Sequence, residues 1–241
     1  MAKDLLYIKT FPEQCYINSS GVGFRLFYDA ITNKPKNLLL LSNAFAQAKI
    51  DQDIFIEYAD TSTIALLYQD DIYNYGDFCW VDYSSDDKKK ELKPQILAEL
   101  LYLNHYKKPL YSPFWNELEN EYAYLAHDDD WWTKIYMRNV ELMKPVIHHK
   151  VLSELKGRKK QIANLPTDIL DAIWAHCENG LAIDFETATV SGSCTGVRFY
   201  PIGVFENMNE MYQRLCWLRT KLVSDSGWLE YNPRNKKWRI Y

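Results

Sequence analysis

The chain has 241 residues, of which 47% are hydrophobic and 25% are charged, and its formal net charge is −4. This composition is typical of a folded globular protein, and the length allows one large domain or two small ones. No stretch approaches the 18 consecutive apolar residues of a membrane-spanning helix, and the first residues lack the apolar core of a signal peptide. We therefore expect a protein of the cytoplasm that has no membrane partner.

Aromatic residues are the most informative part of the composition, with 10 Phe, 8 Trp and 18 Tyr. Their side chains bury large areas, while Tyr and Trp keep a polar group for a hydrogen bond. They are favoured both in cores and in the hot spots of protein interfaces. The composition therefore predicts a well-packed domain with a recognition surface.

The cysteines argue against a disulfide framework. There are five, widely spaced and without a CxxC pair: Cys15, Cys79, Cys177, Cys194 and Cys216. This usage predicts free thiols in a reducing compartment. The chain also has no GxSxG, Walker A or GxGxxG motif, which disfavours nucleotide-cofactor enzymes. We expect no cofactor and no bound metal as the first interpretation.

The first 85 residues are predicted to be mostly strands. Alternating apolar residues predict strands over 22–28, 54–58, 64–68 and 78–83, and the second and third of these are expected to form a hairpin. Between the first and second of these strands, Leu41, Phe45 and Ala48 recur at helical spacing, which predicts a helix within 38–50.

The middle of the chain is predicted to be helical and its end to return to strands. The expected helices are one beginning at Pro94, one over 112–125 capped by Ser112, one over 139–163 broken at Pro145, and one over 167–177. Strands over 181–189 and 196–200, a helix over 208–222 and a hairpin of 227–231 with 236–241 follow. Strand blocks separated from a helical block predict an α+β fold, mainly an antiparallel sheet with helices packed on one side. We treat 1–241 as a single domain, with a boundary near 140–165 left open.

Two carboxylates lie two residues apart on the expected strand over 181–189. The side chains of Asp184 and Glu186 therefore point to the same face, where oxygen ligands could hold Mg²⁺ or Mn²⁺. The alternative is an exposed acidic face that is neutralised by Arg198 or Lys221.

The sequence from Ala182 to Thr187 resembles the first motif of the DEDD-type 3′–5′ exonucleases, a strand with Asp-x-Glu followed by Thr. The resemblance implies that Asp184 and Glu186 ligate metal ions, as in two-metal nucleases, and that Thr187 lies near the substrate. It covers only about six residues. The family places a His or Tyr base downstream, and no His follows Glu186 in this sequence.

Charge is unevenly distributed. Residues 1–130 carry 21 acidic and 12 basic side chains, whereas residues 131–241 carry 11 and 16. The densest acidic run is Asp128, Asp129 and Asp130, which Trp131 and Trp132 follow directly. If a strand begins there, the two indoles point to opposite faces, and an exposed Trp beside charged residues is typical of an interface anchor. The other interpretation is a solvated turn.

The C-terminal hairpin combines basic and aromatic residues. Arg234, Lys236, Lys237 and Arg239 lie among four aromatic side chains. Basic residues with aromatics suit phosphate contacts and base stacking. The alternative is a terminal hairpin that buries its Trp side chains and leaves its cations in solvent.

We expect a non-catalytic protein-binding domain that uses 128–132, and an immunity or antitoxin-type neutraliser of a basic partner is one concrete example. The first alternative is a metal-dependent hydrolase or nuclease that uses Asp184 and Glu186. The second is nucleic-acid binding through the C-terminal hairpin.

Overall fold

The computed structural model describes residues 4–90, 92–105, 109–127, 131–156, 162–191, 194–205, 207–220 and 226–241. In these residues the chain forms seven α-helices and twelve strands, and the strands join one open antiparallel sheet. The α+β prediction is therefore confirmed. Among the described residues, no helix is long and apolar enough to cross a membrane.

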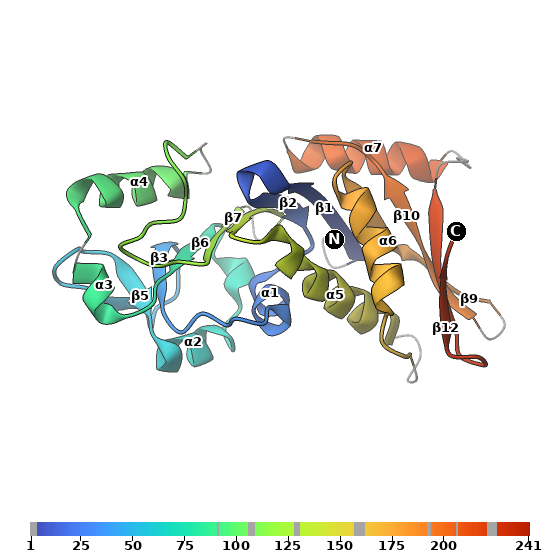
Figure 1. The fold of residues 1–241 in the computed structure, drawn as a ribbon, viewed down its shortest axis with the longest axis horizontal. Helices are drawn as coiled ribbons and strands as arrows, with labels where there is room; N and C mark the ends of the chain where they lie inside the picture. The colour runs from blue at the N-terminus through green and yellow to red at the C-terminus, as the bar shows by residue number, and fades with distance from the viewer. Residues whose placement is uncertain are drawn as a thin grey trace.

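The β1–β2 hairpin lies in the middle of the sheet, and the two wings of the elongated molecule extend from it (Figure 1). The C-terminal wing, from the edge inward, consists of β12 (Lys237–Ile240), β11 (Gly227–Asn232), β10 (Cys194–Pro201) and β9 (Leu181–Ser191). The central hairpin is β1 (Leu5–Phe11) and β2 (Tyr16–Ser20). The other wing continues through β8 (Trp132–Met137), β7 (Tyr122–His127), β6 (Phe78–Asp82), β3 (Leu38–Ser42), β5 (Glu57–Ala59) and β4 (Lys49–Ile50).

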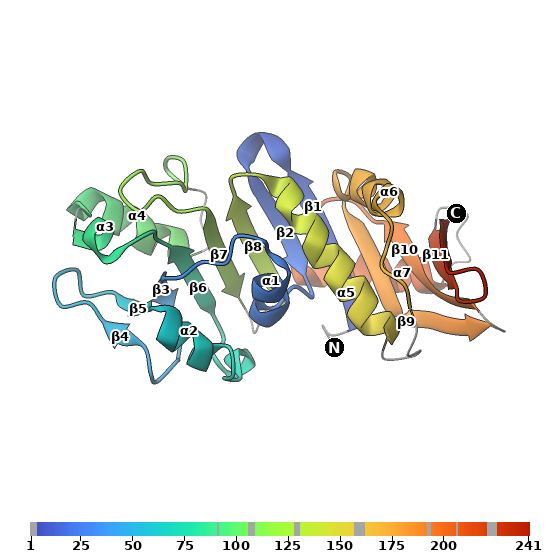
Figure 2. The ribbon, with the colours of Figure 1, turned by 60° about the horizontal axis from the view of Figure 1, so that its bottom comes forward.

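Helices cover both faces of this sheet (Figures 1 and 2). Four helices share one face and its large core: α1 (Phe24–Ala30), α2 (Thr61–Leu67), α5 (Lys144–Lys156) and α6 (Thr167–Cys177). On the opposite face, α4 (Pro94–Asn104) packs on the N-terminal wing and α7 (Met208–Thr220) packs on the C-terminal wing. The short α3 (Asp86–Lys90) lies at the far end of the N-terminal wing. The expectation that helices pack on one side of the sheet thus holds for four helices, whereas α4 and α7 form a second layer on the opposite face.

Strand β1 is buried by helices on both faces of the sheet. Leu6 and Ile8 point into the core beneath α5 and α6, whereas Leu5 and Tyr7 point into the core beneath α7. All four side chains are at most 3% exposed. A strand that is buried on both faces has no polar alternation, so it gives no period-two signal in the sequence.

Residues 22–28, predicted to be a strand, form α1 instead. Gly23 occupies the N-cap, and Phe24, Phe27 and Ile31 form a stripe at spacings of three and four. All three are at most 2% exposed, so burial of this stripe decides the conformation. The period-two pattern in the same residues was coincidental.

The predicted helix within 38–50 begins as β3 and ends as β4. Leu38, Leu39 and Leu40 are buried against neighbours on both faces of the sheet. A short continuous apolar run fits a buried strand or a buried helix equally well by periodicity. Pairing with β5 and β6 decided the outcome here.

The predicted hairpin of 54–58 and 64–68 is also wrong, because 61–67 is α2. The Asp60 carboxylate accepts hydrogen bonds from the Thr63 N–H at 3.0 Å and the Ser62 hydroxyl at 2.7 Å. Such an N-cap satisfies donors that a helix start would otherwise leave unpaired. Asp60, which lies where the predicted hairpin would turn, therefore caps a helix.

Residues 112–125, predicted to be one helix, are an irregular segment followed by β7. Most later predictions are confirmed. The helix beginning at Pro94 is α4, the helix over 167–177 is α6, and the strand and helix pattern after residue 181 agrees with β9 to β12 and α7. Pro145 occupies the first turn of α5, directly after the 3-10 helix Val140–Met143.

Candidate functional site: an aromatic pocket on the central strands

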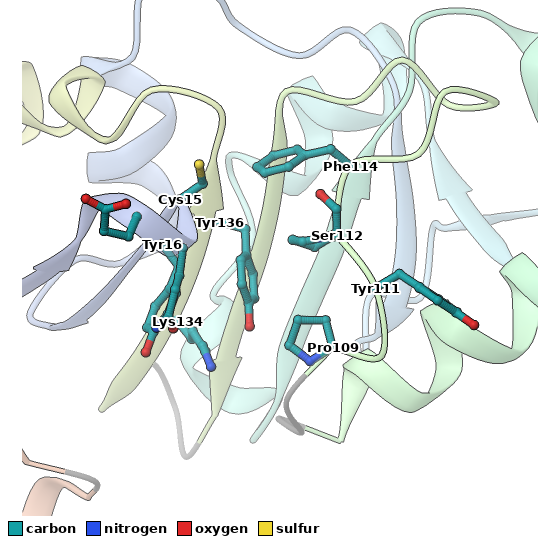
Figure 3. A pocket seen from close by; sticks show the side chains of 11 residues that line it. Cys15, Tyr16, Pro109, Tyr111, Ser112, Phe114, Lys134 and Tyr136 are labelled. Carbon is teal, nitrogen blue, oxygen red and sulfur yellow. The ribbon is translucent and has the colours of Figure 1, made fainter.

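The face of the sheet that carries α4 and α7 is hollowed between them by a pocket of about 740 Å³ (Figure 3). We call it the tyrosine pocket. Its floor is the β2–β8 pair, its wall is the segment before β7, and its rim is the turn between β1 and β2. It is lined by Glu13, Gln14, Cys15, Tyr16, Pro109, Tyr111, Ser112, Pro113, Phe114, Lys134 and Tyr136.

Strand register assembles the floor. Tyr16 of β2 pairs with Tyr136 of β8, and Phe11 of β1 pairs with Tyr16, so these three rings form a row across the sheet. The ring centroids of Phe11 and Tyr16 lie 4.3 Å apart, and those of Tyr16 and Tyr136 lie 5.4 Å apart. Lys134, two residues before Tyr136, shares the same face. Its Nζ lies 4.3 Å from the centroid of the Tyr16 ring, a cation–π distance.

The wall of the pocket is held by one fully buried amide. The Asn120 side-chain nitrogen donates to the carbonyl oxygens of Pro113 at 3.0 Å and Tyr122 at 3.3 Å, and its Oδ1 accepts from the Trp115 N–H at 2.8 Å. These bonds fix residues 113–115 to the start of β7. Phe114 is thereby directed over the pocket, as Figure 3 shows.

Polar groups collect at one end of the floor. Figure 3 shows the hydroxyls of Tyr16 and Tyr136 and the Nζ of Lys134 pointing toward the same end. Tyr136 is 2% exposed, and its Oη has no hydrogen-bond partner among the described residues. Burial raises the pKa of both tyrosines, so both hydroxyls keep their protons. The Tyr136 hydroxyl is itself buried, whereas the side chains of Tyr16 and Lys134 are half-buried.

The structure brings Asp184 and Glu186 together, but it places a cation between them. Asp184 is fully buried, and its carboxylate accepts two hydrogen bonds of 2.6 Å from Arg219 of α7. Arg219 Nη1 also lies 2.8 Å from a carboxylate oxygen of Glu186. The neutralising residue among the described residues is thus Arg219 in place of the expected Arg198, and Lys221 lies outside the described residues. Among the described residues, no group of three His, Cys, Asp or Glu side chains could hold a metal ion.

The predicted binding residues 128–132 are described only in part. Asp128, Asp129 and Asp130 lie outside the described residues. Trp132 is a core residue in place of an exposed anchor, because it is 6% exposed and stacks on Tyr7 at a centroid distance of 5.7 Å. Trp131 is half-buried. Of the predicted surface, the described part therefore retains only Trp131 as a partly accessible indole.

The C-terminal hairpin buries Trp238, whose indole N–H donates to the carbonyl oxygen of Ala163 at 3.1 Å. All four predicted cations are exposed: Arg234, Lys236, Lys237 and Arg239. Strand β12 forms one edge of the sheet. Of the hairpin aromatics, Tyr231 and Trp238 are buried, Trp228 is half-buried and Tyr241 is 65% exposed. Lys237 and Arg239 lie on the free edge strand, where cations oppose pairing with another sheet.

A second arrangement joins Asp77, Cys79 and His127 across β6 and β7. His127 Nδ1 lies 3.1 Å from an Asp77 oxygen, and Nε2 lies 3.9 Å from the Cys79 sulfur. Carboxylate, imidazole and thiol in this order are typical of an activated nucleophile. The thiol, however, is fully buried, so it presents no surface to a substrate.

Sequence reasoning missed the tyrosine pocket because its parts are far apart in the chain. Tyr16 and Tyr136 meet only through the pairing of β2 with β8. The available signal is a stretch over 132–137 that is rich in aromatic, β-branched and apolar residues, which indicates a strand but not its partner. Comparison with known proteins gives no match: no family model, no curated protein and no solved structure resembles the chain.

Proposed function

We propose that this chain is a non-catalytic domain that binds another protein and holds a segment of that partner in the tyrosine pocket. The observation that carries the proposal is the preformed pocket itself, where the half-buried rings of Tyr16 and Phe114 line a cavity of about 740 Å³ whose wall is fixed by the buried Asn120 amide. Tyr and Phe side chains are also the residues that dominate binding energy in protein interfaces.

Charge supports a basic partner. Residues 1–130, which include the rim and wall of the pocket, carry nine more acidic than basic side chains. Such a field accelerates association with a cationic protein. An immunity or antitoxin-type neutraliser is the biological role that fits this combination. The five free cysteines favour the cytoplasm as its compartment.

A pocket-blocking variant tests the proposal. Ser112 is exposed at the wall of the pocket, so Ser112→Trp fills the pocket without disturbing the core. The matched control is Ser153→Trp on the exposed side of α5, on the opposite face of the sheet. Tagged wild-type and variant proteins are incubated at low salt with lysate of the native cell, and the eluates are compared by mass spectrometry and absorbance ratio.

The expected result is one stoichiometric basic protein that is recovered with the wild type and the control but lost with Ser112→Trp. Equal recovery with all three proteins would contradict a role for the pocket. Recovery of nucleic acid that is lost in Lys236→Ala/Lys237→Ala would favour the C-terminal hairpin instead.

A further inference from the structure

We propose that the C-terminal wing carries a second site, where single-stranded nucleic acid stacks its bases on Trp228 and Tyr241. This site lies at β10, β11 and β12, on the face of the sheet that carries α7, and it is independent of the tyrosine pocket. Among the described residues, the core beneath α7 takes strand side chains from β1, β8, β9 and β10 and none from β11 or β12. The apolar face of α7 therefore does not cover the outer part of this sheet face.

Strand pairing places two aromatic rings side by side on this outer part. Trp228 of β11 and Tyr241, directly after β12, exchange backbone hydrogen bonds of 3.2 and 3.0 Å, so their side chains point to the same face. Tyr231 and Trp238 point to the opposite face, where they belong to the large core. Because Tyr241 is 65% exposed and Trp228 is half-buried, only this outward pair can meet a ligand.

Gly196 of β10 lets the Trp228 indole lie flat on the sheet. A Cβ atom at Gly196 would lie 2.5, 2.6 and 2.7 Å from Nε1, Cε2 and Cζ2 of this ring. Since three neighbouring ring atoms are almost equally distant, the face of the ring, and not its edge, lies over the glycine. The opposite ring face is directed away from the sheet, which is the orientation that stacking of a base requires.

Three cations share this face with the rings. Arg198 pairs with Trp228 in the sheet, and its guanidinium carbon lies 6.0 Å from the centroid of a Trp228 ring. Arg239 donates to the Tyr241 hydroxyl at 3.4 Å, and Lys237 lies on the same face two residues earlier. Within the described part of the chain, none of the three cations forms an ion pair.

The charges favour a polyanion. Glu230, which pairs with Arg239, is the one carboxylate that β10, β11 and β12 place on this face, so three cations stand against one anion. The two acids of the adjacent β9 are already held by Arg219. Cations beside exposed rings are the combination that binds single strands, because phosphates contact the cations and bases stack on the rings. Bases of a duplex already stack on one another, so an unpaired strand is the fitting ligand.

Fluorescence anisotropy with labelled oligonucleotides of about ten residues tests the proposal. The ligands are single-stranded oligo-dT and oligo-U, a duplex of the same length, and an abasic strand that keeps the phosphates but lacks the bases. The single strands are expected to bind at least about tenfold more tightly than the abasic strand, because each stacked base contributes to affinity. Three phosphate contacts predict a slope of about −2 for log affinity against log salt.

Ring and charge variants locate the site. Tyr241→Ala, at an exposed position, and Trp228→Thr should each lower affinity for the single strands about tenfold, whereas Trp228→Phe keeps a ring and most of the affinity. Arg198→Gln should make the salt dependence shallower by about 0.7, as expected for one lost phosphate contact.

Two controls leave the rings and their neighbouring cations in place. Arg234→Thr/Lys236→Asn removes two charges from the exposed turn between β11 and β12 and should bind within about twofold of the wild type, because salt screens charges that do not contact the strand. Ser112→Trp, which fills the tyrosine pocket, should bind normally.

Equal affinity for oligo-dT and the abasic strand, or full affinity in both Tyr241→Ala and Trp228→Thr, would overturn the proposal. A loss in Arg234→Thr/Lys236→Asn as large as the loss in Tyr241→Ala would also overturn it, because general charge would then explain the binding. The absence of any oligonucleotide binding at low salt would overturn this site and leave the proposed role of the tyrosine pocket intact.

Discussion

Arg219 holds the carboxylate of Asp184 through two parallel hydrogen bonds of 2.6 Å, which join α7 to the centre of β9. Asp184 is fully buried, while the Arg219 side chain is 22% exposed and also reaches Glu186. A bidentate arginine pair is among the strongest polar contacts in proteins. This contact neutralises an acidic pair that lies beneath α7.

We expect Arg219→Ala to lower the free energy of unfolding by about 3–5 kcal/mol, because it leaves a buried charge without its partner. Urea denaturation followed by tryptophan fluorescence measures the change. The control is Glu186→Gln, at a side chain that is 46% exposed, which should cost less than about 1 kcal/mol. Equal costs for the two variants would contradict the dominant role of Asp184.

We expect Mn²⁺ and Mg²⁺ to leave the melting temperature of the wild type unchanged, because Arg219 already occupies the Asp184 carboxylate. Thermal unfolding with and without each metal tests this expectation. A Mn²⁺-dependent rise that disappears in Asp184→Asn would instead support the metal-dependent hydrolase or nuclease.

Asp82 is expected to make stability depend on pH. The carboxyl is buried, and this burial raises its pKa to about 7 despite hydrogen bonds from the N–H groups of Glu121 and Tyr122. A folded-state pKa above the unfolded value of 3.8 gives stability that is full below about pH 4 and is lost as the pH rises to about 7. The loss is on the order of 4 kcal/mol.

Urea midpoints across this range measure the effect. Asp82→Asn should flatten the profile, because the amide does not ionise. Asp87→Asn, at a carboxylate that is 90% exposed, should leave the profile unchanged. A profile of the Asp82 variant that still falls between pH 4 and 7 would assign the effect to another group.

The acidic run at 128–130 is expected to speed association with the partner. Replacing Asp128, Asp129 and Asp130 with Asn should slow association at low salt by about tenfold and flatten its salt dependence. Stopped-flow or surface plasmon resonance at several ionic strengths measures the rates.

The matched control removes three exposed acids elsewhere, at Asp53, Asp71 and Asp87. This control should slow association less, because it removes the same number of negative charges at positions away from the acidic run. Identical rates for both triple variants would show that overall charge, and not the run at 128–130, steers the partner.

The cations on β12 are expected to prevent this edge strand from pairing with a strand of another molecule. Strand β12 forms one edge of the sheet, and exposed Lys237 and Arg239 lie along it. Lys237→Thr/Arg239→Thr should promote concentration-dependent self-association, which light scattering measures. Arg234→Thr/Lys236→Asn removes the same charge from the adjacent turn and should remain monodisperse if edge position is the cause.

The sequence by itself determined much of the C-terminal half. The stripe of Met211, Leu215 and Leu218 predicted α7, and the turn residues from Asn232 to Asn235 predicted the terminal hairpin. These elements are amphipathic, so burial of one face leaves a period that can be recognised without knowledge of the partner.

The N-terminal half gave no such signal where elements are buried on both sides. Leu38 to Leu40 pack against α-helices on one face and α4 on the other, so the run carries no period. Phe24 fits a period of two with Val22 and Leu26 and a helical period with Phe27 and Ile31, and burial in the core beneath α1 selected the helical one. Tertiary packing therefore decided local structure there.

The functional surfaces were determined only by the tertiary structure. The sequence supplied the abundance of aromatic residues and the acidic bias of residues 1–130. The strand register then placed Tyr16 against Tyr136, and α7 brought Arg219 to Asp184. These partners are separated by 120 and 35 residues, and no local interaction links them; burial of the sheet between two helical layers selects the pairing that joins them.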